Sequence, residues 1–184
     1  IKRNCHLLPC NGTEYLVPTE DKEIAFHTVT ANSMIKEMGA RSFNKLMSIL
    51  CDLQARASTN YSIPLSGHFV QNRESMVNWC PIGRNATTEQ RKEFELLDKE
   101  HAIRLTYLSD LSDMIKDLGL TVKLGGDTSF DIYPTGWDKT YALSHFDIED
   151  WDIWFVGDRC YPEGNDYELF ELLKHQERSF ETAG

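Results

Sequence analysis

The chain has 184 residues, of which 41% are hydrophobic, and a net charge of -10 at pH 7. That length and composition allow one sizeable hydrophobic core or two small ones. The acidic balance argues against nucleic acid as a partner, because an acidic surface repels a phosphate backbone. The sequence contains no run of about 18 apolar residues that would predict a membrane span, and no secretion signal is predicted. The five cysteines form no Cys-x-x-Cys pair, so neither a zinc site nor a disulfide framework is predicted and a reducing cytoplasm is favoured.

The first part of the chain is predicted to contain short strands, one long helix and a hairpin. Residues 1–30 have the composition of short strands separated by turns, with apolar runs at 15–17 and 24–26. Apolar side chains then recur at helical spacing over residues 42–57, which predicts an amphipathic helix. Two further apolar runs, 68–70 and 76–79, flank a polar turn and predict a β-hairpin.

Two helices are predicted next. Thr87 and Gln90 have the spacing of a capping box, so a helix is expected to begin there, with Phe94 and Leu97 on its apolar face. A second helix is expected to end at Gly119. Its predicted apolar face consists of Leu105, Leu108, Leu111, Ile115 and Leu118.

The last part of the chain alternates between strand and helix patterns. Residues 120–124 and 130–133 are predicted to be strands that pair around a Gly-Gly-Asp turn. A short helix over about 138–145 and a buried strand over 153–156 follow. This strand-helix-strand order indicates an α/β layer, and the preceding hairpins and helices indicate an α+β unit inserted into it.

Two side chains near the ends of these elements have the chemistry of a phosphoryl-transfer site. Lys139 stands at a helix start, and Asp158 directly follows an apolar strand, where α/β proteins bind ligands. A lysine balances phosphate and carboxylate charge, and an aspartate holds Mg²⁺. On the residues alone, an ordinary first-turn lysine is the favoured interpretation of Lys139, and Asp158 is equally a helix cap or turn residue.

Four motifs in a fixed order resemble those of the eukaryotic-type phosphomannomutases, a family of the haloacid dehalogenase superfamily. They are Pro-Ile-Gly-Arg at 81–84, Gly-Gly through Ser-Phe-Asp to Pro at 125–134, Gly-Trp-Asp-Lys at 136–139, and Gly-Asp at 157–158 followed by Gly-Asn-Asp at 164–166. The resemblance extends over nearly the whole chain and is weak before residue 68.

The resemblance implies an α/β fold with a haloacid-dehalogenase-like (flavodoxin-like) core and an inserted α+β cap domain. Residues 1–28 and 136–184 correspond to a partial core, and residues 29–135 to the cap. In the family the cap binds substrate and mediates a homodimer, so a homodimer is expected here.

The resemblance also implies an activity. Phosphomannomutases interconvert mannose 6-phosphate and mannose 1-phosphate on the route to GDP-mannose, through an aspartyl-phosphate. They require Mg²⁺ and a hexose 1,6-bisphosphate as activator. Mannose and glucose phosphates are therefore the expected ligands.

Five cap positions match substrate-binding residues of the family. Arg73, Arg84 and Arg91 match the arginines that hold the distal phosphate of the sugar, and Ser129 and Asp131 match residues that contact the sugar. Arginine suits this role because its planar fork donates two hydrogen bonds to a phosphate at once. Without the resemblance, the arginines would be solvated surface charges, and Ser129 and Asp131 would fit the solvent face of a strand equally well.

Four core positions match the family's catalytic machinery. Lys139 matches the lysine beside the phosphoryl group and Asp158 matches a magnesium ligand, with Asn165 and Asp166 in its supporting loop. In this loop, Arg159 and Cys160 replace the usual lysine and threonine.

The superfamily's nucleophile motif, Asp-x-Asp-Gly-Thr, does not occur in the sequence. The chain is therefore expected to be a partial form that lacks the first core segment and the last stretch, and to be inactive by itself. Two alternatives stay open: a cap-bearing sugar phosphatase, which transfers the phosphoryl group to water, and a non-catalytic module that binds sugar phosphates and dimerises.

Overall fold

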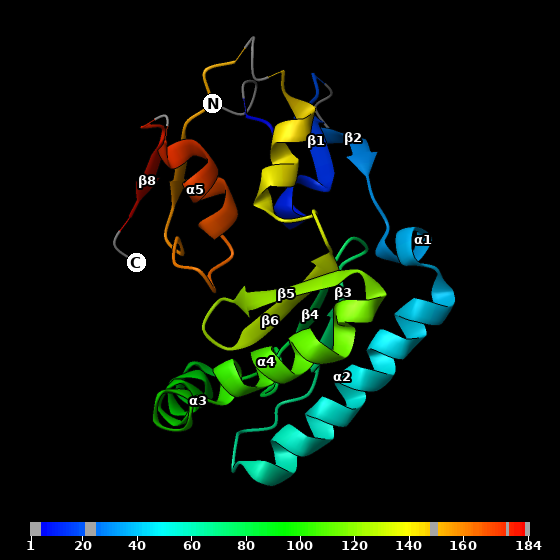
Figure 1. Ribbon diagram of the computed structural model, residues 1–184, viewed down its shortest axis with the longest axis vertical. Coiled ribbons are helices and arrows are strands. Elements are labelled where there is room, and N and C mark those ends of the chain that lie inside the picture. Colours follow the sequence, from blue (N-terminus) through cyan, green and yellow to red (C-terminus); the bar gives the residue numbers. More distant parts are fainter. Residues whose placement is uncertain (1–4, 21–24, 148–150, 176, 183–184) are drawn as a thin grey trace. The chain divides into compact units, whose positions relative to one another are not determined.

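The computed structural model describes residues 5–20, 25–147, 151–175 and 177–182. The chain divides into two compact units, which we describe separately (Figure 1). Unit 1 consists of Ile1–Ser33 and Gly136–Gly184, and unit 2 of Met34–Thr135. No helix among the described residues is long and apolar enough to cross a membrane.

Unit 2 is built on a four-stranded antiparallel sheet with the strand order β3-β4-β6-β5. The strands are β3 (Val70–Asn72), β4 (Val77–Trp79), β5 (Leu120–Gly125) and β6 (Ser129–Pro134). The predicted hairpin and the predicted pairing around the Gly-Gly-Asp turn are both confirmed, and Gly125 pairs with Ser129.

The register of this sheet separates an apolar face from a polar face. Trp79 pairs with Phe130, which pairs with Leu124, and all three are buried. Their neighbours along the strands point to the opposite face, because side chains alternate along a strand. There Asn78 pairs with Asp131 and Asp131 pairs with Lys123. The core therefore lies on one side of the sheet and a row of polar side chains on the other.

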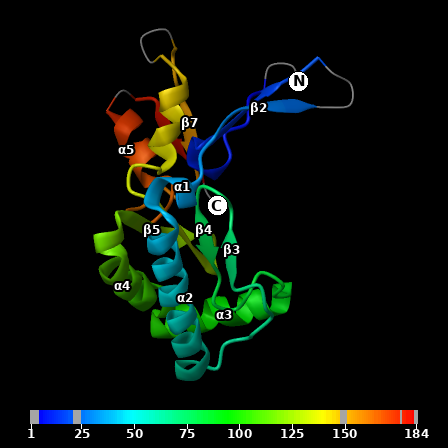
Figure 2. The same cartoon turned by 90° about the vertical axis from the view of Figure 1, so that its right-hand side faces the viewer.

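Helices cover the apolar face (Figure 1). Unit 2 has the helices α1 (Met34–Met38), α2 (Ala40–Asn60), α3 (Thr88–His101) and α4 (Ile103–Ile115), followed by the 3₁₀ turn η3 (Lys116–Leu118). Figure 2 shows α2 running beside α4. Both bury one side against the sheet, where the Trp79 and Phe130 rings stack with centroids 4.8 Å apart.

Three of the helix predictions are confirmed, and one of the predicted faces is partly wrong. The helix predicted over 42–57 is α2, and Thr87 and Gln90 form the predicted capping box of α3. Gly119 ends η3 with a φ of +67°. Leu105, however, is 53% exposed. Leu111 and Ile115 are buried as predicted. Ile103 and Tyr107, each one helical turn further toward the start of α4, complete its buried side.

Unit 1 contains two small sheets. The strands β1 (Glu14–Pro18) and β2 (Phe26–Ala31) pair antiparallel, and β7 (Phe155–Gly157) and β8 (Ser179–Glu181) pair parallel. The strand predicted over 24–26 begins at Phe26, and Ile24 lies outside the described residues.

The remaining elements of unit 1 are α5 (Tyr167–Lys174) and the 3₁₀ helices η2 (Cys10–Gly12) and η4 (Lys139–His145). The helix predicted over 138–145 is therefore present as η4, with Asp138 as its cap. The strand predicted over 153–156 is shorter than expected and is not buried, since Val156 is 62% exposed. Among the described residues, the sheet of β7 consists of β7 and β8, and α5 packs against both strands.

Candidate functional site

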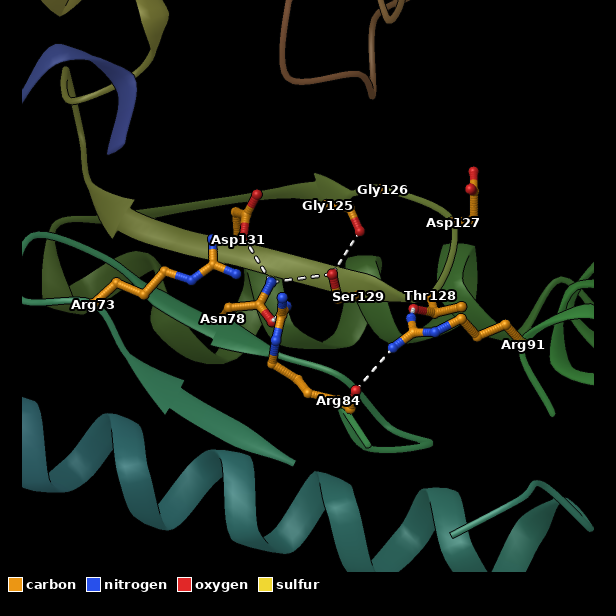
Figure 3. A pocket seen from close by; sticks show the side chains of 10 residues that line it. All are labelled: Arg73, Asn78, Arg84, Arg91, Gly125, Gly126, Asp127, Thr128, Ser129 and Asp131. Carbon is orange, nitrogen blue, oxygen red and sulfur yellow. Dashed lines mark hydrogen bonds between the residues drawn. The ribbon is translucent and has the colours of Figure 1, made fainter. Parts of the chain in front are cut away.

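A cavity of about 250 Å³ lies on the polar face of the unit 2 sheet (Figure 3). The structure brings five predicted residues together in its wall: Arg73, Arg84, Arg91, Ser129 and Asp131. They come from the β3–β4 turn, the loop after β4, α3 and β6. The other lining residues are Asn78, Gly125, Gly126, Asp127 and Thr128.

Asn78 is the centre of the hydrogen-bond network of this cavity. Its side-chain amide donates to Ser129 Oγ at 3.0 Å, to the carbonyl oxygen of Phe130 at 3.2 Å and to Asp131 Oδ1 at 2.8 Å. Its Oδ1 accepts from Arg84 Nη1 at 2.8 Å. Only 2% of Asn78 is exposed. Sequence reasoning missed this residue, although an asparagine between two apolar residues of a buried strand was an available signal.

Arg84 is placed by the tight turn of the Pro-Ile-Gly-Arg motif. Gly83 has a φ of +84°, and its N–H donates to the carbonyl oxygen of Cys80 at 2.8 Å. A Cβ on Gly83 would lie 2.0 Å from the carbonyl oxygen of Gly67, so only glycine fits this position. The turn thus directs Arg84 at Asn78.

Arg91 lies in the first turns of α3 and is held on three sides. Its Nε donates to the carbonyl oxygen of Ala86 at 3.2 Å, its Nη2 to that of Arg84 at 2.9 Å, and its Nη1 to Thr128 Oγ1 at 3.1 Å. The α3 N-terminus adds the partial positive charge of its backbone N–H groups. These contacts fix the guanidinium before any ligand arrives.

The opposite wall of the cavity carries oxygen acceptors. Ser129 Oγ donates to the carbonyl oxygen of Gly125 at 2.5 Å, and a Cβ on Gly125 would lie 2.8 Å from Asp131 Oδ2. The Asp131 carboxylate therefore lies close above a residue without a side chain. The lining residues carry three guanidinium groups and two carboxylates, those of Asp127 and Asp131. The cavity combines local positive charge with hydroxyl acceptors, the combination that a phosphorylated polyol needs.

The predicted core residues gather in unit 1. Lys139, the first residue of η4, forms an ion pair with Asp166, which precedes α5. Asp166 Oδ2 also accepts from the backbone N–H groups of Asp158 at 3.1 Å and Arg159 at 3.0 Å. Asp166 is buried, Asn165 is half-buried and Asp158 is exposed. Asp166 therefore organises the loop that presents the Asp158 carboxylate.

The charge state of Asp166 follows from these contacts. Burial alone would raise the pKa of its carboxyl group. The hydrogen bond from Lys139 and those from the N–H groups of Arg159 and Asp158 outweigh burial and hold the pKa below its ordinary value of 3.8. Asp166 is thus an anion at neutral pH, and it keeps the Lys139 ammonium in place.

The donors at Asp158 fit Mg²⁺ rather than a softer metal. Within the part of the chain that the structure describes, no three His, Cys, Asp or Glu side chains gather into a metal-binding cluster. Mg²⁺ needs no such cluster, because it commonly binds one or two carboxylates and fills its remaining positions with water and substrate phosphate. An exposed carboxylate on an ordered loop meets that requirement.

We expect Lys139→Met to destabilise unit 1 by about 2 kcal/mol at pH 7, because it leaves a buried carboxylate without its cation. Asp166 has a lowered pKa in the folded chain. Its stabilising contribution is therefore complete above the ordinary pKa of 3.8 and is lost as the pH falls below that value. The difference in the free energy of unfolding between the variant and the unchanged chain should therefore become smaller in acid. Urea unfolding at pH 7 and at about pH 3, followed through the backbone amide signals of β7, measures it.

Lys174→Met is the matched control, since the Lys174 ammonium pairs with Glu171 at 2.9 Å on the exposed side of α5. We expect this variant to leave the stability of unit 1 unchanged. An equal loss in both variants would contradict the role assigned to the Lys139–Asp166 pair.

Comparison with known proteins shows which proteins the chain resembles. The sequence profile of the family described as eukaryotic phosphomannomutase matches residues 16–182. Phosphomannomutases from Schizosaccharomyces pombe and Saccharomyces cerevisiae are 43% and 42% identical to the chain over 144 residues. These alignments cover 77% of this chain and 54% and 55% of the two relatives, so the chain spans about half the length of the relatives it matches.

A similar fold occurs in a solved structure, that of N-terminal truncated, IMP-bound Plasmodium falciparum IMP-nucleotidase. The TM-score is 0.53 at 11% identity, and the match covers 91% of this chain and 43% of that chain. At this identity the likeness shows the fold alone, and it confirms the predicted haloacid-dehalogenase-like α/β class. The resemblance of the four sequence motifs is confirmed by the family profile, which spans most of the sequence: the chain belongs to the eukaryotic phosphomannomutase family.

Proposed function

We propose that the unit 2 cavity binds a hexose phosphate, with Arg73, Arg84 and Arg91 around the phosphate group. The observation that carries this proposal is the convergence of three guanidinium groups on one cavity in a chain whose net charge is -10. A phosphate dianion gains most from several charge-assisted donors that are already in place. Arg84 and Arg91 are held by Asn78, Ala86 and Thr128, which supports preorganisation.

Ser129 and Asp131 then bind the hydroxyl groups of the sugar. Asp131 Oδ1 is oriented by the Asn78 amide, and its carboxylate accepts hydroxyl protons. Ser129 Oγ is oriented by Asn78 and by the Gly125 carbonyl. These two bonds leave Ser129 with acceptor capacity for the sugar.

The reaction that we propose for the intact protein is the interconversion of mannose 6-phosphate and mannose 1-phosphate. Unit 2 serves as the cap, and unit 1 belongs to the core, where Lys139 balances the charge of the transferred phosphoryl group. Asp158 would hold Mg²⁺, supported by Asn165 and Asp166, and the metal when bound supplies further neutralisation of phosphate charge. A hexose 1,6-bisphosphate would act as activator, glucose phosphates would be related ligands, and the location would be cytoplasmic.

For this chain by itself, a second candidate is a binding module without chemistry. The observation that favours it is the absence of the Asp-x-Asp-Gly-Thr motif from the sequence. Without that nucleophile no aspartyl-phosphate forms by the superfamily's mechanism. We also propose a homodimer through unit 2. The family resemblance supports it, because the cap mediates a homodimer in that family.

Phosphorus NMR on the chain with mannose 1-phosphate, Mg²⁺ and glucose 1,6-bisphosphate tests these proposals. We expect the mannose 1-phosphate resonance to shift or broaden on binding, with no growth of the mannose 6-phosphate signal. Arg84→Ala should weaken binding at least about tenfold, because it removes a charged donor and leaves Asn78 Oδ1 without its partner. Arg56→Ala is the control, since Arg56 forms an exposed ion pair with Asp52 on α2.

Each outcome separates the candidates. Growth of mannose 6-phosphate would show that a nucleophile is present and would overturn the binding-module reading. Steady release of inorganic phosphate without isomer would favour the sugar phosphatase. Equal affinity in Arg84→Ala and the unchanged chain would refute the phosphate site.

A further inference from the structure

We infer that Arg104 and Asp98 form a positioning pair that holds the β5–β6 turn against the sugar. The inference rests on the proposed hexose phosphate site and adds two residues that do not line it. Neither residue matches a motif singled out in the sequence. Their role follows from hydrogen bonds between the α3–α4 junction and the turn that closes the cavity.

Arg104 links three parts of unit 2. Its backbone N–H donates to Asp98 Oδ1 and its Nε to Asp98 Oδ2, both at 2.6 Å. Its Nη1 donates to the carbonyl oxygen of Gly126 at 2.9 Å. Only 16% of the Arg104 side chain and 11% of the Asp98 side chain are exposed. Such a shielded ion pair, joined by a second hydrogen bond from the backbone, is better fixed than a surface ion pair.

Two cavities lie on either side of the connection that Arg104 makes, and the turn itself lines only the first. Gly126, Asp127 and Thr128 line the hexose phosphate site. A second cavity, of about 260 Å³, is lined by Asp98, Lys99, Ala102, Arg104, Leu105 and Leu124. Arg104 lines this second cavity and not the first, so any effect that it has on the site passes through the turn.

The backbone of the turn makes an external anchor useful. It is a three-residue connection between the paired residues Gly125 and Ser129, and Gly126 has a φ of +59°. Glycines leave such a connection with more conformational freedom than other residues would. The bond from Arg104 to the Gly126 carbonyl restrains it at its start. Ser129, at its end, is one of the residues proposed to contact the sugar.

Loss of this anchor should affect the sugar end of the site more than the phosphate end. Arg91 bonds to Thr128 of the turn, but its bonds to the carbonyl oxygens of Ala86 and Arg84 do not depend on the turn. Arg84 is held by Asn78 of β4. The arginines therefore keep their places when the turn moves, whereas Asp127 lies within the turn and moves with it. Ser129, at the end of the turn, keeps only its bonds to Asn78 and to the Gly125 carbonyl.

The test compares two ligands, mannose 1-phosphate and inorganic phosphate, on the full chain by NMR titration. We expect Arg104→Met to weaken mannose 1-phosphate binding about tenfold and to change phosphate binding less than about twofold, because small misplacements of positioning groups are costly. Arg104→Lys keeps a positive charge beside Asp98 but lacks the fork that bonds Asp98 and Gly126 together. Arg104→Lys should also lose affinity for mannose 1-phosphate selectively, by about threefold. It replaces Arg104→Met as the test variant if Arg104→Met does not fold.

Lys99→Met is the matched control, because Lys99 lines the same second cavity and makes none of these bonds to the turn. It should leave both affinities unchanged. If the unchanged chain binds both ligands and Arg104→Lys preserves the ratio of their affinities, the positioning role is overturned and the hexose phosphate site stands. A loss of equal size for both ligands also overturns the role, because it reports general destabilisation. If the unchanged chain binds neither ligand, the proposed function fails and this inference fails with it.

Discussion

Asn78→Asp is expected to destabilise unit 2 by about 3 kcal/mol and to abolish hexose phosphate binding, although the two side chains have nearly the same shape. In the folded chain the Asn78 amide donates to Ser129 Oγ, to the Phe130 carbonyl and to Asp131 Oδ1. A carboxylate oxygen in its place donates nothing. It would face the Asp131 carboxylate at 2.8 Å, in a position that is almost fully buried.

Hydrogen exchange of the β4 and β6 backbone amides measures this effect, because it reports on unit 2 without contributions from unit 1. Asn72→Asp is the control. Asn72 is the exposed last residue of β3, and its side chain accepts a hydrogen bond from the N–H of Glu74 at 3.0 Å, which an aspartate also does. Equal exchange rates in Asn78→Asp and the unchanged chain would contradict the central role of this residue.

The fold of unit 2 was largely predictable because its signals are local. The capping box at Thr87 and Gln90 and the alternation along β5 and β6 act between residues close in the sequence, and the structure contains them as expected. Leu105 was misassigned for a physical reason: several apolar residues of one helix compete for the core. Only the packing of α4 on β5 decides which of them is buried.

The residues of the site also differ in whether the sequence alone could identify them. The arginines and the Ser-Phe-Asp segment were identified because they belong to motifs that resemble a family. Asn78, Asp98 and Arg104 belong to no such motif. Their importance comes from hydrogen bonds to residues 22 to 53 positions away or across a helix junction. Those bonds follow from the strand register and from the α3–α4 junction, which the sequence pattern does not specify.

The strand β7 was mispredicted for a third reason. Its apolar sequence predicts burial on both faces, as in the interior of a parallel sheet. In the described residues it has one partner, β8. The Trp154 and Phe180 side chains stack with their ring centroids 5.8 Å apart, and they are 58% and 50% exposed. An apolar sequence predicts that a strand is suited to a buried position. It does not tell how many neighbouring strands pair with it, and that number decides whether the strand is buried.

Gly83→Ala is expected to destabilise unit 2 by about 3 kcal/mol, although it adds a single methyl group. Two costs coincide at this position. The φ of +84° is unfavourable for any residue with a side chain, and the new Cβ would lie 2.0 Å from the carbonyl oxygen of Gly67. That oxygen belongs to the backbone, so the clash cannot be relieved by rotating a side chain. Relief requires the turn to open, which moves Arg84 away from Asn78 and should weaken mannose 1-phosphate binding in parallel.

Gly119→Ala separates these two costs. Gly119 has a comparable φ of +67°, but a Cβ there would meet nothing within 4 Å. It should therefore cost only about 1 kcal/mol and leave ligand affinity unchanged. Hydrogen exchange in β4 measures the stability of both variants, and phosphorus NMR measures their affinity. If the two alanine variants lost the same stability, the close approach of Gly83 to Gly67 would be irrelevant. If Gly83→Ala lost stability but kept full affinity, the turn would not be what places Arg84 in the site.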